Sequence, residues 1–274
     1  MAHKINLDGE DVVFTSLFGK YEKLNELKID KNPKTRYLCF TDDDDLTSET
    51  WEIFLITPKS DLNPQRNSRE IKMLGHKYFI DGTRSLYIDN TVSLKVDGKI
   101  ILDYWLSDTD IAFMTHSTRK TVRSEFFWCS AYGLDKQSTI LRQFTCYKNV
   151  TSGLLYEKPY WGGMIARVNC ESTEKYMQTW DMQYRLFSCR DQLSINISTM
   201  LSRTAIKRIN AKNDSSEWHI WPVPSKRITK NQFCEKFTLL RKALILKRII
   251  LYGHRYYFNY YNLQHLLFKS NIKK

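Results

Sequence analysis

The sequence predicts an α/β domain whose single central sheet is mixed, mostly parallel and flanked by helices. Three observations predict this fold. Short apolar segments typical of buried strands occur beside longer segments with helical spacing of apolar residues. Three expected strands come first, and helices and strands then alternate, as in α/β sheets. Acidic and other polar residues follow several of these strands at the carboxyl ends, where open α/β sheets bind ligands.

The expected elements follow one another along most of the chain. Strands are expected over 11–19, 34–40 and 51–56, then a helix over 64–79 and a strand over 85–92. Residues 98–105 and 110–114 continue the alternation. Further helices are expected over 119–132, 136–147, 172–186 and 191–201, with a strand over 164–168. The stretch that begins at Ser202 is polar as far as Glu217.

The positive charge is concentrated at one end of the chain. The net charge is +12, but residues 226–274 hold twelve Lys or Arg and one acid, so this segment carries +11 and the rest +1. We therefore predict a catalytic domain over 1–225 and a basic, aromatic-rich helical tail over 226–274. Apolar residues at 239, 243, 246 and 250 of the tail form a helical stripe. Two interpretations stay open, a helix on an anionic membrane surface and a helix packed on the domain.

Composition excludes several classes of protein. The six cysteines are widely spaced and form no C-x-x-C pair, which argues for reduced thiols and against a zinc knuckle. The first residues lack the apolar core of a signal peptide, and no apolar run is long enough to span a membrane. We expect a cytoplasmic protein, which the tail could place on the inner face of a membrane. Neither G-x-G-x-x-G nor G-x-x-x-x-G-K-[ST] occurs, so side chains and a cation must hold any phosphate.

The stretch 66–94 carries the strongest functional signal. Arg69, Lys72 and His76 are spaced so that they share one side of the expected helix. Asp89 ends the next expected strand. Cations beside a strand-end acid indicate a site for a diphosphate and for a metal such as Mg²⁺ or Mn²⁺. The alternatives are a solvated helix face, a core position for His76, and a turn that Asp89 caps.

Two other strand ends carry candidate ligands. Asp42 and Asp43 follow the strand 34–40 and could accept hydrogen bonds from a ribose or a base, or they could form a solvated turn. His116 and Arg119 follow the strand 110–114. They could bind the donor or the acceptor of a reaction, and a structural hydrogen-bonding role is the alternative.

A Trp-Gly-Gly sequence and an Asp-Gln pair complete the candidates. Gly162 and Gly163 permit close approach of a backbone to a ligand, and Trp161 could stack on a sugar. A tight turn leading into a strand is the alternative. Asp191 and Gln192 open the helix 191–201, where Asp is a common cap and could also reach a reacting group.

Taken together, these segments resemble the mucilage-related glycosyltransferase-like family, which was formerly a domain of unknown function. The matching pieces lie in one order between residues 12 and 200: CFTDD, NPQRNSREIKMLGHKYF, SLYIDNTVSL, the pair His116-x-x-Arg119, GGMIAR and SCRDQLSIN. The family is similar to GT-A glycosyltransferases, so the resemblance implies a GT-A-like domain that binds a nucleotide-sugar.

The resemblance also implies roles for individual residues. Asp89 matches the first acid of the Asp-x-Asp metal motif, whereas Thr91 occupies the position of the second acid. The implied Mn²⁺ or Mg²⁺ would therefore be held by Asp89 and a distant ligand, for which His219 is the candidate. Asn90 is expected on the donor side with Arg69 and Lys72.

The remaining implied roles concern the reacting sugar. Asp191 matches the acid near the anomeric carbon or the acceptor, and either inversion or retention is compatible with it. His116, Arg119, Trp161, Gly162, Gly163 and Gln192 are expected on the acceptor or sugar side.

The implied function is transfer of a sugar from a nucleotide-sugar, most simply a UDP-sugar, to a polysaccharide or a lipid-linked glycan. A catalytically inactive nucleotide-sugar- or glycan-binding module is the main alternative, because the second acid is missing. A nucleic-acid-binding protein that uses the basic tail is a weaker alternative, because the body is almost neutral. We therefore expect no nucleic-acid partner.

Overall fold

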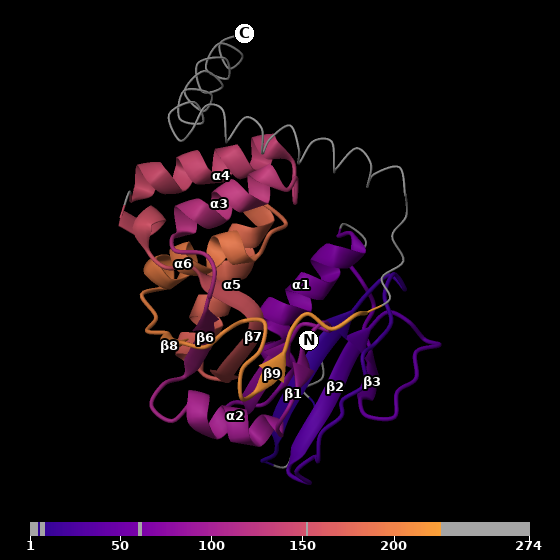
Figure 1. Cartoon of the computed structure of the whole chain (residues 1–274). Coiled ribbons are helices and arrows are strands. Elements are labelled where there is room, and N and C mark those ends of the chain that lie inside the picture. Colours follow the sequence, from indigo (N-terminus) through magenta and orange to yellow (C-terminus); the bar gives the residue numbers. More distant parts are fainter. Residues whose placement is uncertain (1–4, 6–8, 60–61, 152, 226–274) are drawn as a thin grey trace.

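A seven-stranded mixed sheet forms the centre of the domain (Figure 1). The structure is a computed structural model and describes residues 5, 9–59, 62–151 and 153–225. The strands lie in the order β3-β2-β1-β4-β7-β6-β8, and β7 alone runs antiparallel to its neighbours. This arrangement confirms the predicted α/β class with a mixed, mostly parallel sheet. The strands are β1 (Asp11–Leu17), β2 (Thr35–Thr41), β3 (Glu52–Leu55), β4 (Arg84–Ile88), β6 (Ile111–Thr115), β7 (Tyr160–Val168) and β8 (Lys207–Ile209).

Helices cover both faces of the sheet because successive strand residues point to opposite sides. Phe14 of β1 belongs to the core cluster that contains Ile71 of α1 and Trp180 of α5. Its neighbour Val13 belongs to the opposite cluster, with Trp105 of α2. The helices are α1 (Pro64–Leu74), α2 (Gly98–Trp105), α3 (Val122–Ala131), α4 (Gln137–Val150), α5 (Glu171–Leu186) and α6 (Gln192–Ser202).

Helices α3, α4 and α6 form a separate cluster with its own apolar core. Phe126, Ile140 and Leu193 are fully buried there, one from each helix. Figure 1 shows α3 and α4 stacked above α5 and α6. Because α6 also packs on β7 and α5, this cluster places the amino end of α6 beside the sheet.

Two predicted elements end earlier than expected. The helix expected over 64–79 ends at Leu74 and continues as the 3₁₀ turn η1 (Gly75–Tyr78). A Cβ at Gly75 would lie 2.8 Å from the Phe14 ring, so the chain here passes unusually close to β1. The strand expected over 85–92 ends at Ile88, because Val92 N donates to Asp89 O (2.8 Å) and closes a turn.

The segment after α6 contains strands that the sequence did not predict. β8 adds an edge strand to the main sheet, and β9 (His219–Ile220) pairs with β5 (Ser93–Leu94) in a small antiparallel sheet. In the described part of the chain, no helix has the length and apolar character needed to cross a membrane. The division at residue 226 stays a prediction, since residues 226–274 lie outside the described residues, and so do both interpretations of the tail.

Candidate active site

Four charged side chains from three elements meet at the carboxyl end of β4. Arg69 and Lys72 come from α1, Asp89 follows β4 directly, and Asp191 precedes α6. Lys72 Nζ lies 2.6 Å from Asp191 Oδ2 and 3.4 Å from Asp89 Oδ1. Arg69 also bridges the two acids, with Nη1 3.2 Å from Asp89 Oδ1 and Nε 3.4 Å from Asp191 Oδ2. We call these four residues the charge cluster.

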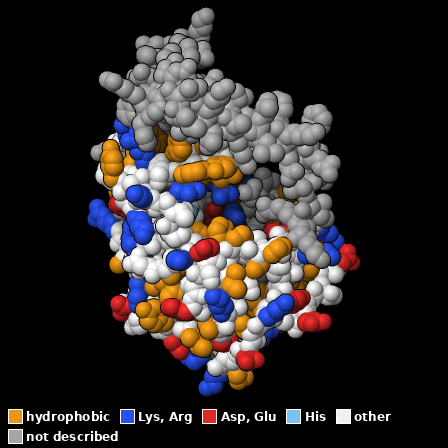
Figure 2. Space-filling view, viewed as in Figure 1, with side chains coloured by type: hydrophobic (Ala, Val, Ile, Leu, Met, Phe, Trp, Pro, Cys, Tyr) orange, Lys and Arg blue, Asp and Glu red, His pale blue; other side chains and the backbone are white. Residues whose placement is uncertain are grey.

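The charge cluster is buried at one end and open at the other. The side chains of Lys72 and Asp191 are 1% and 8% exposed, whereas those of Arg69 and Asp89 are 21% and 23% exposed. Figure 2 shows a hollow near the middle of this face, with basic and acidic side chains at its bottom. In Figure 1 the same place lies between α1 and α6. A ligand would therefore reach the cluster from the Arg69 and Asp89 side.

The electrostatics keep one acid and one base of the cluster, Asp191 and Arg69, charged. Burial alone would raise the pKa of Asp191, but the charges of Lys72 and Arg69 outweigh burial and hold this pKa well below its usual range. Burial would likewise lower the pKa of Arg69, yet Asp191 and Asp89 keep this pKa well above its ordinary value. Each of the two acids of the cluster thus contacts both of its bases.

A helix cap and a hydrogen bond to β1 fix the position of α1. Asn63 caps the helix by accepting from Arg66 N (2.9 Å), and Pro64 occupies the first turn, where its missing N–H costs nothing. Ser16 of β1 donates to Ser68 O (3.0 Å). These contacts set the rotation of α1, so that Arg69 and Lys72 turn toward the end of β4.

Tyr87 completes the cluster, although sequence reasoning placed it among apolar strand residues. Its hydroxyl donates to Asp89 Oδ1 (2.9 Å), and Lys72 Nζ lies 5.2 Å from its ring centroid. Burial, with the charge of Asp89, raises the pKa of Tyr87 well above its ordinary value, so the hydroxyl keeps its proton. The strand spacing could have indicated this contact, because Tyr87 and Asp89 are two residues apart and therefore point to the same face of the sheet.

The two glycines of β7 lie against this cluster. Asp89 N donates to Gly163 O (2.9 Å), and Gly162 N donates weakly to Gln192 Oε1 (3.4 Å). A Cβ on Gly162 would lie 3.3 Å from Lys72 Nζ. The absence of a side chain at Gly162 therefore leaves the space that the Lys72 ammonium uses.

Gly163→Ala is expected to destabilise the domain by about 1–3 kcal/mol, the usual cost of overpacking a core. Its Cβ would lie 2.2 Å from the Trp161 ring, so the buried indole would have to move. Urea unfolding measures the loss. Gly153→Ala is the matched control, because its Cβ would meet nothing closer than 3.7 Å. Equal stability of both variants would show that Trp161 relaxes freely.

A second group of polar residues surrounds the end of β6. Glu125 of α3 is buried, with Oε2 3.2 Å from Arg119 Nε and 3.8 Å from His116 Nε2. The Arg119 guanidinium lies 4.4 Å from the Trp128 ring centroid. His116 Nδ1 accepts from the N–H groups of Thr118 and Arg119 (both 3.3 Å). Burial, with the charges of Arg119 and Lys158, lowers the pKa of His116 to about 4, so the ring is neutral at pH 7.

Arg190 connects the two groups. Its charge helps to lower the pKa of Asp191 and also acts on Cys129, whose thiol donates to Glu125 Oε1 (3.5 Å). Sequence reasoning missed Glu125 and Arg190. Glu125 lies in the first turn of α3, where an acid is common, and Arg190 lies inside the matching segment SCRDQLSIN, where it was given no role.

Comparison with known families adds an independent observation. The family model TOD1/MUCI70, glycosyltransferase-like domain, matches residues 34–213, which is more than half of the 274 residues. The chain belongs to this family. The match includes all four residues of the charge cluster and confirms the family resemblance seen in the sequence.

Among curated proteins, no sequence matches this TOD1/MUCI70 domain. Among solved structures, mouse xyloside xylosyltransferase 1 in its apo form is 8% identical, with a TM-score of 0.40 over 73% of this chain and 84% of that chain. The apo structure of the bifunctional glycosyltransferase WbbM is 10% identical, with a TM-score of 0.43 over 88% of this chain and 45% of that chain.

The TOD1/MUCI70 domain holds its other predicted donor residues at the same edge of the sheet, each with a protein partner. Asp42 Oδ1 accepts from Gly19 N (2.8 Å), and Asp43 pairs with Lys20 (2.7 Å). Asn90 accepts from Asn25 N (2.9 Å) and donates to Lys23 O (2.8 Å). These three residues order the loops around the hollow, and their contact with a donor stays a prediction.

The structure does not bring His76 to the charge cluster. His76 is 1% exposed, and its Nδ1 lies 3.2 Å from Met73 O. The helix prediction placed His76 beside Lys72, but the 3₁₀ turn at Gly75 rotates it into the core. His76 is therefore the core histidine that the sequence had left as an alternative.

This burial predicts an acid sensitivity of the TOD1/MUCI70 domain. Burial, with the charge of Arg167, lowers the pKa of His76 to about 3 from an ordinary value of 6.5. As the pH falls, His76 is thus protonated near pH 6.5 in the unfolded chain but only near pH 3 in the folded chain. His76 therefore does not change the free energy of unfolding above pH 6.5. Between pH 6.5 and about pH 3 it lowers the free energy of unfolding by about 1.4 kcal/mol per pH unit.

Urea unfolding between pH 7 and pH 4 measures this slope. His76→Leu is expected to reduce the slope by about one proton relative to the wild type. An unchanged slope would contradict a neutral, buried His76.

The C-terminal strap, residues 213–225, contains His219. Both ring nitrogens of His219 have protein partners, Nδ1 with Ser216 Oγ (2.8 Å) and Nε2 with Asn213 O (2.9 Å). The ring is buried and stacks on Trp161 at a centroid distance of 5.4 Å. These contacts give His219 a structural role in the strap, and the metal role of His219 and the sugar contact of Trp161 stay predictions.

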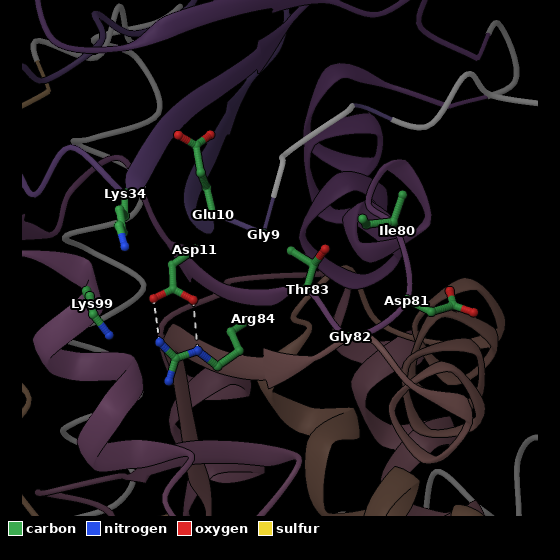
Figure 3. A pocket seen from close by; sticks show the side chains of 10 residues that line it. All are labelled: Gly9, Glu10, Asp11, Lys34, Ile80, Asp81, Gly82, Thr83, Arg84 and Lys99. Atoms are coloured by element: carbon green, nitrogen blue, oxygen red, sulfur yellow. Dashed lines mark hydrogen bonds and ion pairs between the residues drawn. The ribbon is translucent and has the colours of Figure 1, made fainter.

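The cavity in Figure 3 lies at the opposite edge of the sheet, at the amino ends of β1, β2 and β4. It has a volume of about 430 Å³, and both acids and bases line it. Its Arg84 pairs with Asp11 through two contacts of 2.8 and 2.5 Å. Because strand-end ligand sites lie at the carboxyl edge, this cavity is separate from the candidate active site.

Proposed function

We propose that this domain transfers a sugar from a UDP-sugar to a glycan acceptor, either a polysaccharide or a lipid-linked glycan. The observation that carries the proposal is the charge cluster at the carboxyl end of β4, in a chain of a glycosyltransferase-like family. Such a cluster offers two cations to a diphosphate and a carboxylate to the reacting sugar.

In the proposed reaction the bond between the anomeric carbon and the diphosphate oxygen breaks, and UDP leaves with the bonding electrons. Lys72 and Arg69 stabilise the negative charge that develops on this leaving group. The acceptor hydroxyl forms the new bond to the anomeric carbon and loses its proton. Holding donor and acceptor together supplies much of the remaining rate enhancement.

Asp191 has the role that depends on stereochemistry. In an inverting reaction it accepts the acceptor's proton, and in a retaining reaction it orients or stabilises the sugar. While Lys72 lies 2.6 Å from it, Asp191 is a weak base, because its pKa is held low. A bound diphosphate competes for Lys72 and Arg69, and so raises the basicity of Asp191 when the donor is in place.

The acceptor side is proposed to lie around Glu125, Arg119 and Trp128. The Arg119 guanidinium is held between the indole face and the carboxylate and remains 24% exposed. Arg119 can therefore donate to sugar hydroxyl groups from a fixed position.

A panel of nucleotide-sugars tests the proposal by measuring nucleotide release with and without Mn²⁺. Slow hydrolysis of one UDP-sugar is the expected result, and Asp89→Ala is expected to abolish it. Asp108→Ala is the control, because Asp108 is exposed and pairs with Lys207 on another surface. Binding without turnover would favour an inactive binding module, and the absence of both would contradict the proposal.

A further inference from the structure

We infer that Lys72 and Arg69 neutralise the donor diphosphate directly, and that no divalent cation bridges the diphosphate to Asp89. This inference rests on the proposed function and concerns the same site. It differs from the metal-bridged arrangement that the sequence resemblance implies, in which Asp89 and a second ligand hold Mn²⁺ or Mg²⁺.

The first observation is that two cations and a hydroxyl already bind one oxygen of the Asp89 carboxylate, Oδ1. Oδ1 receives Tyr87 Oη at 2.9 Å, Arg69 Nη1 at 3.2 Å and Lys72 Nζ at 3.4 Å. A divalent ion on this carboxylate would lie beside two positive charges that the fold fixes in place. A divalent ion takes about six or more oxygen ligands, and the neighbours of Asp89 Oδ1 are two cations and a phenol rather than further carboxylates.

The second observation is that the position of the missing second acid has a structural use. Thr91 Oγ1 accepts from Trp221 Nε1 (3.2 Å), and Thr91 O accepts from Val223 N (2.8 Å). Trp221 packs in turn on Trp161, with ring centroids 5.3 Å apart. Thr91 thus anchors the C-terminal strap, and its hydroxyl is engaged by an indole N–H.

The third observation is that neighbouring groups do not replace the missing ligand. His219 uses both ring nitrogens within the strap, as described above. Among the described residues, the one group of three or more potential metal-ligating side chains that lie close together is Asp43, Asp44 and Asp45. The ammonium group of Lys20 lies 2.7, 3.4 and 3.0 Å from these three carboxylates, so they already share a cation.

The fourth observation is that the fold holds the Lys72 ammonium group in one position, from which it could bind a ligand. Its Nζ is buried between the Tyr87 ring and the backbone of Gly162, where a Cβ would lie only 3.3 Å away. Arg69 lies on the open side and remains partly exposed. A diphosphate that enters from this side meets Arg69 first and Lys72 behind it, without any step that requires an ion.

Calorimetric titration of the full chain with UDP, and separately with GDP, tests the inference. Each titration is done in EDTA and then in Mn²⁺. UDP is expected to bind with the same Kd in both buffers, within about twofold. Arg69→Gln is expected to weaken binding by about tenfold or more in both, the usual effect of losing a charge-assisted hydrogen bond. Lys77→Gln is the matched control, since Lys77 is exposed.

The outcomes separate the two proposals. Binding of UDP or GDP in Mn²⁺ but not in EDTA would overturn the inference and leave the proposed function standing. Failure of both nucleotides to bind in either buffer would overturn the proposed function and the inference with it. Metal-independent binding that Arg69→Gln leaves unchanged would place the diphosphate elsewhere and would also overturn the inference.

Discussion

Lys72→Met is expected to lower donor turnover by about 10²–10³-fold, the loss typical of removing one group that stabilises a developing negative charge. The same change is expected to destabilise the domain by about 3–5 kcal/mol, because Asp191 then remains buried without its closest partner. Lys72 is 1% exposed and lies 2.6 Å from Asp191, so little water is available to solvate the Asp191 carboxylate once the ammonium group is removed. Nucleotide release and urea unfolding measure the two effects.

A double variant separates catalysis from folding. Adding Asp191→Asn to Lys72→Met removes the unpaired carboxylate, so much of the lost stability is expected to return. Turnover is expected to stay low, because the ammonium group and the Asp191 carboxylate are both absent. Recovery of turnover together with stability would show that Lys72 and Asp191 serve only the fold. Lys77→Met, an exposed substitution on η1, should change neither quantity.

Asp191→Asn alone is expected to lower turnover by about 10²–10⁴-fold, the range for a positioned acid or base. The amide keeps the size of the side chain but cannot accept a proton or pair with Lys72. Single-turnover rates with the best donor measure the loss. If Asp191→Asn turns over the donor at the wild-type rate, the reacting sugar lies elsewhere.

The stability of Asp191→Asn also has a defined pH dependence. The pKa of Asp191 is lowered in the folded chain, so its carboxylate stabilises the fold above the unfolded value of about 3.9. This contribution disappears as the pH falls through and below that value. The difference in stability between wild type and Asp191→Asn should therefore be full above about pH 5 and shrink toward about pH 2. A constant difference would contradict an ionised, paired Asp191.

The sheet was predictable because its signals are local. Each main strand except β8 is an apolar run, and the residues that follow these runs lie at one edge once the strands are parallel. The helical spacing of Arg69 and Lys72 likewise placed both on the side that faces Asp89. Neither inference required knowledge of distant contacts.

The rest depended on contacts that no local pattern encodes. His76 followed the same spacing, but the close approach of Gly75 to Phe14 changes the helix type before it. Trp221 follows the polar stretch in the sequence, and its partner Thr91 lies 130 residues earlier. Glu125 becomes informative only when the end of β6 brings His116 and Arg119 to it.

The central claim is that the charge cluster holds the diphosphate of the donor. A crystal structure of the chain grown with UDP tests this claim most directly. The account predicts diphosphate oxygens within hydrogen-bond distance of Lys72 Nζ and the Arg69 guanidinium, with Asp191 beside the position of the sugar. A diphosphate bound in the cavity beside Arg84 and Lys34, with the ion pairs of the charge cluster intact, would contradict it.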